Sequence, residues 1–342
     1  MYNEKMYFAA ANGFDGFRSN FERLFFPEEF KKLYVLKGGP GTGKSTLMKK
    51  VGAKFEGHTH VTYVFCSSDP RSLDGVILEN DNVKIGIVDG TAPHVVEPKY
   101  PGAVEEIINL GDGFDYPALM SRAEQIITLS NGKSKAYKSG YSALKSAGEI
   151  YKQIDMILFD IGVYNKAETF AAKITSHEKT GGNTDFETRF LISSFSKDGY
   201  TSLPLSGEGK DVITVKGDGF YEYAVMMKIY EILKEKQALK SVYRSPLSEA
   251  IIDALESNTH IYTTVREIGN GVKNDAVLNK SAAYNDLKDK YNCLLAEAQE
   301  SFRKASEYHF ELEDIYSRNI TFESNNTKLN RIISAIEELF NK

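Results

Sequence analysis

Short apolar runs, each followed by a turn, recur in the first third of the chain and predict buried β-strands. The runs are residues 33–36, 61–65 and 83–88, and polar or glycine-rich segments bound each of them. Between the first two runs, Leu47, Met48 and Val51 recur at the spacing of one face of a helix. This alternation of strand and helix predicts an α/β fold with a parallel sheet.

A longer segment, residues 118–157, carries apolar residues at helical spacing. Tyr137, Tyr141, Leu144, Tyr151 and Ile154 keep a near-heptad spacing, and lysines fill the other face. Asn131-Gly132 is a turn-type dipeptide and predicts a break into two helices. We therefore expect a packed helical hairpin, with a lid or a partner-binding arm as the functional alternative.

The C-terminal segment is similar and longer, since residues 272–342 contain neither glycine nor proline. A helix from about residue 275 to 316 would be roughly 60 Å long at 1.5 Å per residue. Residues 319–326 (NITFESNN) predict a break before a last amphipathic helix. The apolar stripe of the long helix comprises Tyr284, Leu287, Tyr291, Leu294, Ala298, Phe302, Ala305 and Leu312.

Composition narrows the class of protein. A hydrophobic content of 42% with 26% charged residues is typical of a globular chain, and 342 residues allow two domains. The net charge of −5 argues against a general nucleic-acid binder, and the two cysteines provide no disulfide framework. No run reaches the ~18 apolar residues of a membrane span, and residues 1–17 do not resemble a signal peptide. We expect a cytoplasmic protein without membrane or nucleic-acid partners.

The strongest chemical signal, KGGPGTGKST, directly follows the first predicted strand. Its spacing fits G-x-x-x-x-G-K-[ST], the phosphate-binding P-loop, in the required strand–loop–helix context. Glycines let backbone N–H groups converge on phosphate, the lysine adds charge, and the serine hydroxyl can ligate Mg²⁺. We predict an ATP and Mg²⁺ site formed by Gly38, Gly39, Pro40, Gly41, Thr42, Gly43, Lys44, Ser45 and Thr46.

A P-loop needs a second metal contact, usually an aspartate at the end of a neighbouring strand. Asp89 directly follows the run 83–88 and meets this requirement. Asp160 in MILFDIGVY is the competitor, but it follows a long helical pattern. We therefore predict Lys44 and Asp89 as catalytic residues, and Ser45 and Asp89 as metal ligands.

Polar residues after the other predicted strands should lie at the same edge of the sheet, where α/β proteins place ligands. Each acid or histidine among them could orient a water molecule or a substrate hydroxyl, and each could equally structure its own loop. The predicted substrate rim comprises Asp69, Arg71, Asp74, His94 and Glu97.

Three weak matches occur in the same order in both halves of the chain. They align Asp15-Gly16 with Asp198-Gly199, Lys37-Gly38 with Lys216-Gly217, and Leu78-Glu79 with Leu255-Glu256, at offsets of 183, 179 and 177 residues. Each half also continues into a long helical segment. Together these features predict an internal duplication, with one domain at 1–178 and a second at 179–342.

The second half has lost the phosphate chemistry. Glu222, Tyr223 and Ala224 stand where the first loop has Gly43, Lys44 and Ser45. The same comparison places Arg266 opposite Asp89. Bulky Phe220, Tyr221 and Tyr223 should fill the loop, and we expect a degenerate domain that keeps the fold without binding a nucleotide.

Three strings in the first half, KGGPGTGKSTLMKK, CSSDPRSLDGV and VDGTAPHVVEPKYPGAVEEIINLGD, resemble an uncharacterised bacterial family of duplicated P-loop ATPases. The resemblance covers the first half closely and the second half only in outline. It implies nucleotide binding and hydrolysis. Family members usually keep the lysine motif in both halves, so the degenerate second loop is a departure.

The subclass stays open. NKAE at residues 165–168 departs from the guanine-reading N-K-x-D, so we expect ATP rather than GTP. There is no LSGGQ-like stretch, and Gly90 replaces the acid that often follows the metal aspartate. The alternatives are an ATPase that moves its helical arms or second half, a kinase for a small molecule or nucleotide, and an adaptor with negligible turnover. The arms could also bind a protein partner.

Overall fold

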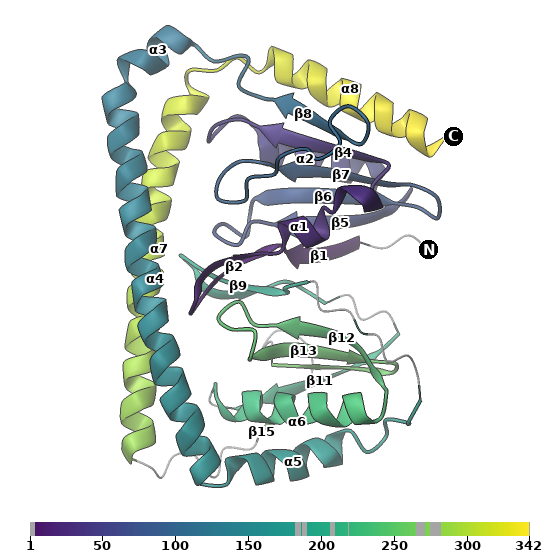
Figure 1. Ribbon diagram of the computed structural model, residues 1–342, viewed down its shortest axis with the longest axis vertical. Coiled ribbons are helices and arrows are strands. Elements are labelled where there is room, and N and C mark those ends of the chain that lie inside the picture. The colour runs from purple at the N-terminus through teal and green to yellow at the C-terminus, as the bar shows by residue number, and fades with distance from the viewer. Residues whose placement is uncertain are drawn as a thin grey trace.

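The computed structural model describes residues 4–181, 186, 190–205, 209–217, 219–264, 271–273 and 282–341. Figure 1 shows two sheet-containing units, one above the other, and a pair of long helices that runs beside both. The predicted α/β class is confirmed, with a mostly parallel six-stranded sheet in one unit and a five-stranded sheet in the other.

The first unit contains the sheet β1-β5-β6-β7-β4-β8, in which only β6 runs antiparallel to its neighbours. The predicted strands at 33–36, 61–65 and 83–88 are β4, β5 and β7. Strand β4 lies between two parallel neighbours, which explains its uninterrupted apolar run. The elements are β1 Glu4–Phe8, β2 Ala10–Gly13, β3 Gly16–Ser19, α1 Phe21–Leu24, η1 Pro27–Glu29, β4 Lys32–Lys37, α2 Lys44–Phe55, β5 His60–Phe65, β6 Leu73–Glu79, β7 Lys84–Asp89 and β8 Glu105–Asn109.

The second unit contains the sheet β12-β13-β14-β11-β15. Its strands follow the same order and the same directions as β5-β6-β7-β4-β8 of the first unit. A hairpin, β9/β10, precedes this sheet as β2/β3 precedes the first loop. The elements are β9 Ser193–Ser196, β10 Gly199–Ser202, β11 Asp211–Lys216, α6 Tyr221–Glu235, β12 Leu239–Arg244, β13 Ile252–Ser257, β14 His260–Thr263 and β15 Gly271–Lys273.

The long helices form an antiparallel pair rather than two hairpins. Helix α4 is unbroken, so the predicted break at Asn131-Gly132 is wrong. A Cβ at Gly132 would lie 2.8 Å from the Tyr308 ring of α7, so this glycine allows close packing of the two helices and does not end α4. The predicted break near residue 320 is confirmed. The helices are α3 Tyr116–Ser121, α4 Ala123–Asp160, α5 Val163–Ile174, α7 Ala282–Ser317 and α8 Glu323–Phe340.

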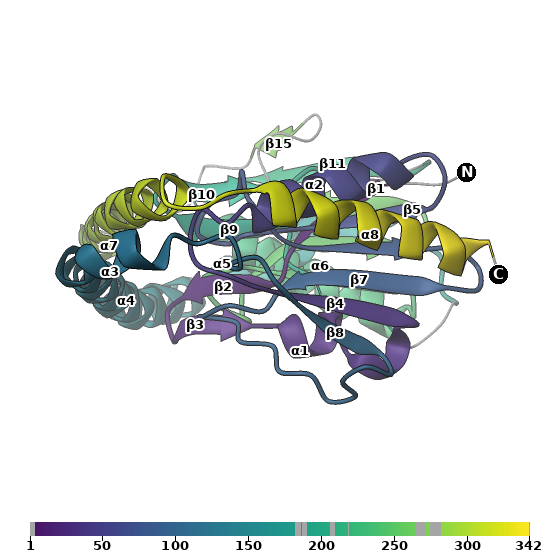
Figure 2. The same ribbon diagram turned by 90° about the horizontal axis from the view of Figure 1, so that it is seen from above.

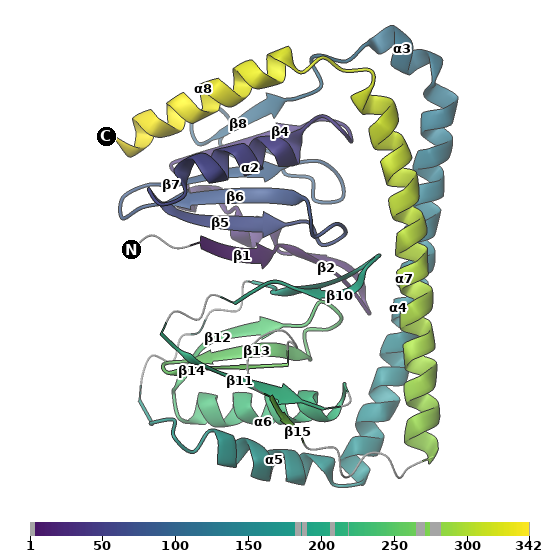
Figure 3. The ribbon, with the colours of Figure 1, turned by 180° about the vertical axis from the view of Figure 1, so that it is seen from behind.

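Each long helix runs from one unit to the other. Helix α4 leaves the first unit and leads into α5, which packs on α6 of the second unit; α7 leaves the second unit and leads into α8. Ile332 and Ile336 of α8 are fully buried in the core of the first unit, and Figures 2 and 3 show α8 lying along this unit beside α2. The last helix of the chain therefore completes the first unit, across the predicted boundary at residue 178.

Hydropathy along the described helices stays too low for a membrane span, even in α4 and α7.

Candidate active site

The loop between β4 and α2 has the conformation that its glycines predict. Gly41 and Gly43 have φ angles of +71° and +87°, which side chains other than glycine rarely adopt. Lys44 opens α2, and its Nζ donates hydrogen bonds to the carbonyl oxygens of Gly38 and Gly39, both at 2.9 Å. The ammonium group therefore lies against the loop, where an anion bound by the loop would meet it.

Asp89 stands beside this lysine. It ends β7 opposite Leu36 of the parallel strand β4, and its Oδ2 lies 3.8 Å from Lys44 Nζ. Its Oδ1 accepts hydrogen bonds from the backbone N–H and the hydroxyl of Thr91, at 2.9 and 2.6 Å. The competitor Asp160 is an exposed residue at the end of α4, on a helix rather than at a strand end, so it does not join the loop.

The remaining loop side chains are also ordered. Ser45 Oγ accepts the backbone N–H of Leu73 at 2.9 Å, and Thr42 Oγ1 donates to the Gly39 carbonyl at 2.9 Å, whereas Thr46 is exposed. The Ser45 hydroxyl and the Asp89 carboxylate supply oxygen ligands, which Mg²⁺ prefers. These residues fit a magnesium ion by donor type.

Asp74 and His94, both predicted as rim residues, meet in the interior. Asp74 Oδ2 lies 3.4 Å from His94 Nε2, and both side chains are buried. Burial and the charge of Asp89 raise the pKa of Asp74 to about 8. Burial lowers the pKa of His94, whose ring stacks on Phe21 at 4.2 Å between centroids. A neutral acid beside a neutral imidazole could exchange a proton with a reacting group.

The other rim residues pair at the surface or at its margin. Arg71 is exposed and its Nε lies 3.1 Å from Asp69 Oδ1. Glu97 is exposed and pairs with Lys37 at 2.8 Å. Lys37 also donates to the carbonyls of residues 90 and 96, so Glu97 helps to fasten the segment that follows Asp89.

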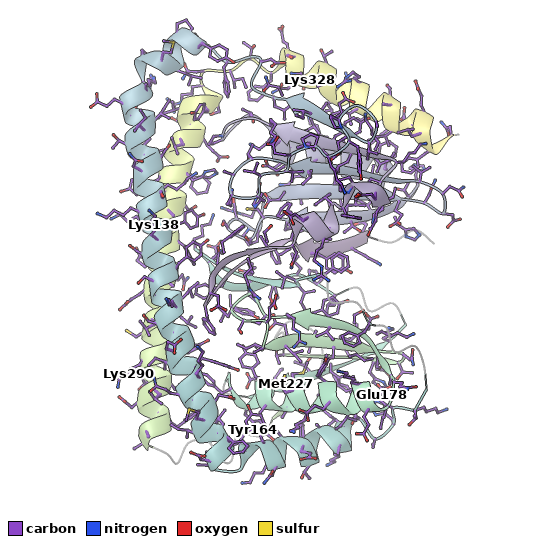
Figure 4. The ribbon with its side chains drawn as sticks, viewed as in Figure 1. Lys138, Tyr164, Glu178, Met227, Lys290 and Lys328 are labelled. Carbon is purple, nitrogen blue, oxygen red and sulfur yellow. The ribbon has the colours of Figure 1, made fainter. Side chains whose placement is uncertain are left out.

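The C-terminal arm lies directly on the glycine-rich loop 38–46, which sequence reasoning missed. A Cβ at Gly41 would lie 2.8 Å from the Glu313 carbonyl oxygen of α7. Asn325 of α8 is buried and donates to the carbonyls of Thr42 and Leu110, both at 3.1 Å. Lys328, labelled on α8 in Figure 4, adds a 2.6 Å ion pair across the same junction, to Asp112.

Two titratable groups from the long helices, Lys133 of α4 and His309 of α7, face the site as well. Burial, with the charges of Lys133 on α4 and Lys44, lowers the pKa of His309 on α7 to about 4. In the sequence, the only sign of these two residues is that each lies on the polar face of an amphipathic helix. That pattern is shared by every solvent-facing residue, so it could not select them.

The second loop is filled by its own side chains. Both carboxylate oxygens of Glu222 accept the backbone N–H of Gly219 at 2.9 Å, so an internal anion occupies an N–H group of this loop. Phe220 and Tyr221 are buried, and the Phe220 ring lies 5.2 Å from that of Tyr291. Of the three aromatic residues predicted to fill the loop, Phe220 and Tyr221 pack in the core of this unit and Tyr223 is half-buried, so the side chain that lies in the loop is Glu222.

The predicted match of Asp89 with Arg266 needs a correction. Arg266 lies outside the described residues, but the sheet register identifies another counterpart. Thr214 pairs with Thr263 as Val35 pairs with Val88. Thr264 therefore holds the position of Asp89, and a hydroxyl replaces the carboxylate there.

The match of Leu78-Glu79 with Leu255-Glu256 is also wrong, by two residues. Ala254 pairs with Thr263 as Gly75 pairs with Val88, which makes Asp253 the counterpart of Asp74. The β13–β14 turn is shorter than the β6–β7 turn, and hairpin turns change length more freely than strands change register.

Asp253 is buried like Asp74 but is held differently. Its Oδ2 accepts hydrogen bonds from Tyr200 OH, at 2.5 Å, and from Ser193 Oγ. Burial raises the pKa of Asp253 to about 6. Hydroxyl donors thus bind one oxygen of the carboxylate in the second unit, whereas Asp74 faces a histidine and a second acid.

A separate cluster in the second unit could hold a metal ion. Glu178 Oε1 lies 3.4 Å from His260 Nδ1 and 3.7 Å from His177 Nε2. This set of two imidazoles and one carboxylate suits Zn²⁺. Ser257 Oγ and Tyr262 OH also donate to Glu178, at 2.6 and 2.9 Å, so the buried carboxylate is satisfied without an ion.

Comparisons with known proteins find no matching family model, no similar curated protein and no similar solved structure.

Proposed function

We propose that the protein is a P-loop NTPase that binds ATP at the loop 38–46 and hydrolyses it with Mg²⁺. The observation that carries the proposal is the meeting of Lys44 and Asp89. A lysine that opens a helix after a left-handed glycine lies 3.8 Å from an aspartate at the end of the adjacent parallel strand. This arrangement is the one that phosphate and metal binding require in P-loop enzymes.

The residues have distinct roles in this proposal. Backbone N–H groups of the loop and the N-terminus of α2 bind the phosphates. Lys44 releases the Gly38 and Gly39 carbonyls and contacts the outer phosphates. Ser45 and Asp89 would hold Mg²⁺, which neutralises charge that develops on the phosphate oxygens when it is bound.

The arms offer a physical route from hydrolysis to movement. The Gly41 backbone touches α7, and the Thr42 carbonyl is held by α8, so a change in the loop displaces both helices. Helix α7, about 54 Å long at 1.5 Å per residue, starts beside the second unit and ends at this loop. We propose that the nucleotide state sets the position of the arm relative to the second unit.

A kinase is the second candidate, and the Asp74–His94 pair favours it. The neutral imidazole of His94, 3.4 Å from the buried acid Asp74, could accept the proton of a substrate hydroxyl during phosphoryl transfer. An ATPase releases phosphate without an added acceptor, whereas a kinase needs one.

The same features support membership in the family of duplicated P-loop ATPases. The two sheets share strand order and direction over five strands, as a duplication requires. The second unit is then a degenerate domain that lacks the lysine and the metal ligands.

Phosphate release from Mg-ATP tests the proposed function. A charge-assisted contact is worth about 1.5–3 kcal/mol, so Lys44→Ala should weaken ATP binding by roughly 10- to 150-fold. Lys50→Ala, an exposed lysine on the same helix, is the matched control and should bind as the wild type does. Unchanged ATP affinity in Lys44→Ala would refute the assignment of the loop.

Asp89→Asn tests the metal ligand. It should reduce turnover more than nucleotide binding, because charge stabilisation is needed most in the transition state. Turnover at the wild-type rate in this variant would exclude Asp89 from the metal site.

A further inference from the structure

The turn between β9 and β10 brings Lys197 of the second unit to the first unit's site. Its Nζ lies 3.4 Å from Asp69 Oδ1 and 4.9 Å from the centroid of the Phe310 ring on α7. The side chain is buried, and among the described residues its Nζ has no hydrogen-bond partner. Asp69 is shared with Arg71. A buried ammonium group with one shared counter-ion is incompletely compensated, so it favours a further anion.

Lys197 and Lys44 act on the same part of α7. Burial raises the pKa of Glu313, and the charges of both lysines oppose this shift. Burial lowers the pKa of His309, and Lys133, Lys44 and Lys197 lower it further. Cationic groups from the loop, from α4 and from the second unit, together with the carboxylate of Asp69, therefore act on the stretch of α7 that covers the phosphate loop.

The corresponding turn of the first unit, between β2 and β3, reaches into the second unit. Asp15-Gly16 and Asp198-Gly199 occupy the same place in their hairpins, so Phe14 is the counterpart of Lys197. The Phe14 ring lies 5.8 Å from Tyr151 and 6.3 Å from Tyr291, in the aromatic cluster at the second loop.

The two hairpins lie side by side between the sheets, β2 beside β9 (Figures 1 and 3). Asn12 Nδ2 donates to the Phe195 carbonyl at 2.8 Å and joins them. Each tip thus enters the opposite unit's site. The tip that enters the second unit carries the aromatic Phe14 and meets aromatic residues there. The tip that enters the first unit carries the cationic Lys197 and meets the site that keeps Lys44.

We propose that Lys197 binds the outer phosphate of the nucleotide and stabilises the charge that develops there, so that the degenerate unit activates the first unit's site. This role rests on the proposed function. In hydrolysis the oxygen of water attacks the γ-phosphorus, and the bond from phosphorus to the bridging oxygen breaks. The electron pair stays on the β-phosphate of ADP, and a proton of the water is released as inorganic phosphate forms. A cation from outside the loop that stabilises this charge strongly accelerates the reaction in related chemistry.

Lys197→Met, which removes the charge and keeps the length, tests the role. Turnover should fall roughly 100-fold or more, as when one transition-state donor is removed. ADP affinity should stay within about threefold, since the contact is to the outer phosphate and tenfold needs 1.4 kcal/mol. The variant should also fail to trap Mg-ADP with aluminium fluoride, whereas Lys197→Arg should trap it. Lys138→Met, an exposed lysine labelled on α4 in Figure 4, is the control and should behave as the wild type does.

A purely structural role, in which Lys197 only neutralises Asp69, predicts a different result. The double variant Asp69→Asn/Lys197→Met removes both charges together, so it should fold even where loss of Lys197 alone destabilises the protein. We expect it to bind ADP and to remain at least about 100-fold below Asp69→Asn in turnover. Turnover of the double variant within about threefold of Asp69→Asn would overturn the role of Lys197.

The outcomes also separate this role from the proposed function. No turnover and no Mg-ATP binding in the wild type would refute both. Wild-type turnover that survives Lys197→Met unchanged, with Lys44→Ala inactive, would refute the Lys197 role alone.

Discussion

Asn325→Ala tests whether the C-terminal arm is fastened to the glycine-rich loop 38–46. The side-chain amide donates two hydrogen bonds of 3.1 Å, to the Thr42 carbonyl of the loop and to the Leu110 carbonyl after β8. Each bond contributes about 0.5–1.5 kcal/mol, and the two acceptors lose their donor in a buried place. We therefore expect the free energy of unfolding to fall by roughly 2–4 kcal/mol.

The neighbouring Asn326 is exposed, so Asn326→Ala is a matched control on the same turn of helix and should change the free energy of unfolding by less than about 0.5 kcal/mol. Denaturant titrations of both variants, compared at their midpoints and slopes, measure the difference. Limited proteolysis adds a local readout. Loss of the anchor should expose the segment 318–322 between α7 and α8 to cleavage, because locally weakened elements open more often.

Equal stability of the two variants would refute the assignment of Asn325 as an anchor. An Asn325→Ala protein that is destabilised but binds and hydrolyses ATP as the wild type does would refute the coupling of arm and loop. In that case the arm would only complete the core of the first unit.

Three further predictions follow from the same contacts. Calorimetry should find one Mg-nucleotide per chain, and Tyr223→Lys should add no second site because Glu222 still occupies the loop; two sites in either protein would contradict this. The pKa of His309 is lowered to about 4, so the neutral form favours folding above pH 6.5 and this stability is lost as the pH falls towards 4. His309→Phe should therefore flatten the dependence of the free energy of unfolding on pH between these two values. An unchanged slope would contradict this prediction. Gly140→Ala should destabilise the α4–α7 pair by roughly 1–3 kcal/mol, because a Cβ there would lie 2.5 Å from the buried Phe302 ring; an unchanged thermal midpoint would show that the pair can yield.

The comparison of the two units shows where sequence alignment fails. Leu255-Glu256 resembles Leu78-Glu79 in letters, but hydrogen-bond register assigns Asp253 to Asp74. The error comes from a hairpin turn of different length. Two identical residues in each half cannot show where the turn length changes, whereas the hydrogen-bond pairing of the strands shows it.

Local chemistry let the sequence by itself determine the conformation of the glycine-rich loop, the strands on both sides of it and the meeting of Asp89 with Lys44. Glycine spacing, short apolar runs and an acid at a strand end act within a few residues, or across directly neighbouring parallel strands. The sequence also predicts the buried faces of the long helices, since Tyr284, Phe302 and Leu312 are buried as their spacing predicts.

Only the tertiary structure decided what those arms cover and which distant groups reach the site. Gly132 reads as a helix break in isolation, but the Tyr308 ring of another helix occupies the space beside it. Lys197 reaches Asp69, and Asn325 meets the loop, from positions more than 120 residues away along the chain. A polar residue on a helix face or turn carries no local mark of its partner. Its role is set by the packing of whole elements, because the energy of burying one face decides which distant segment lies against it.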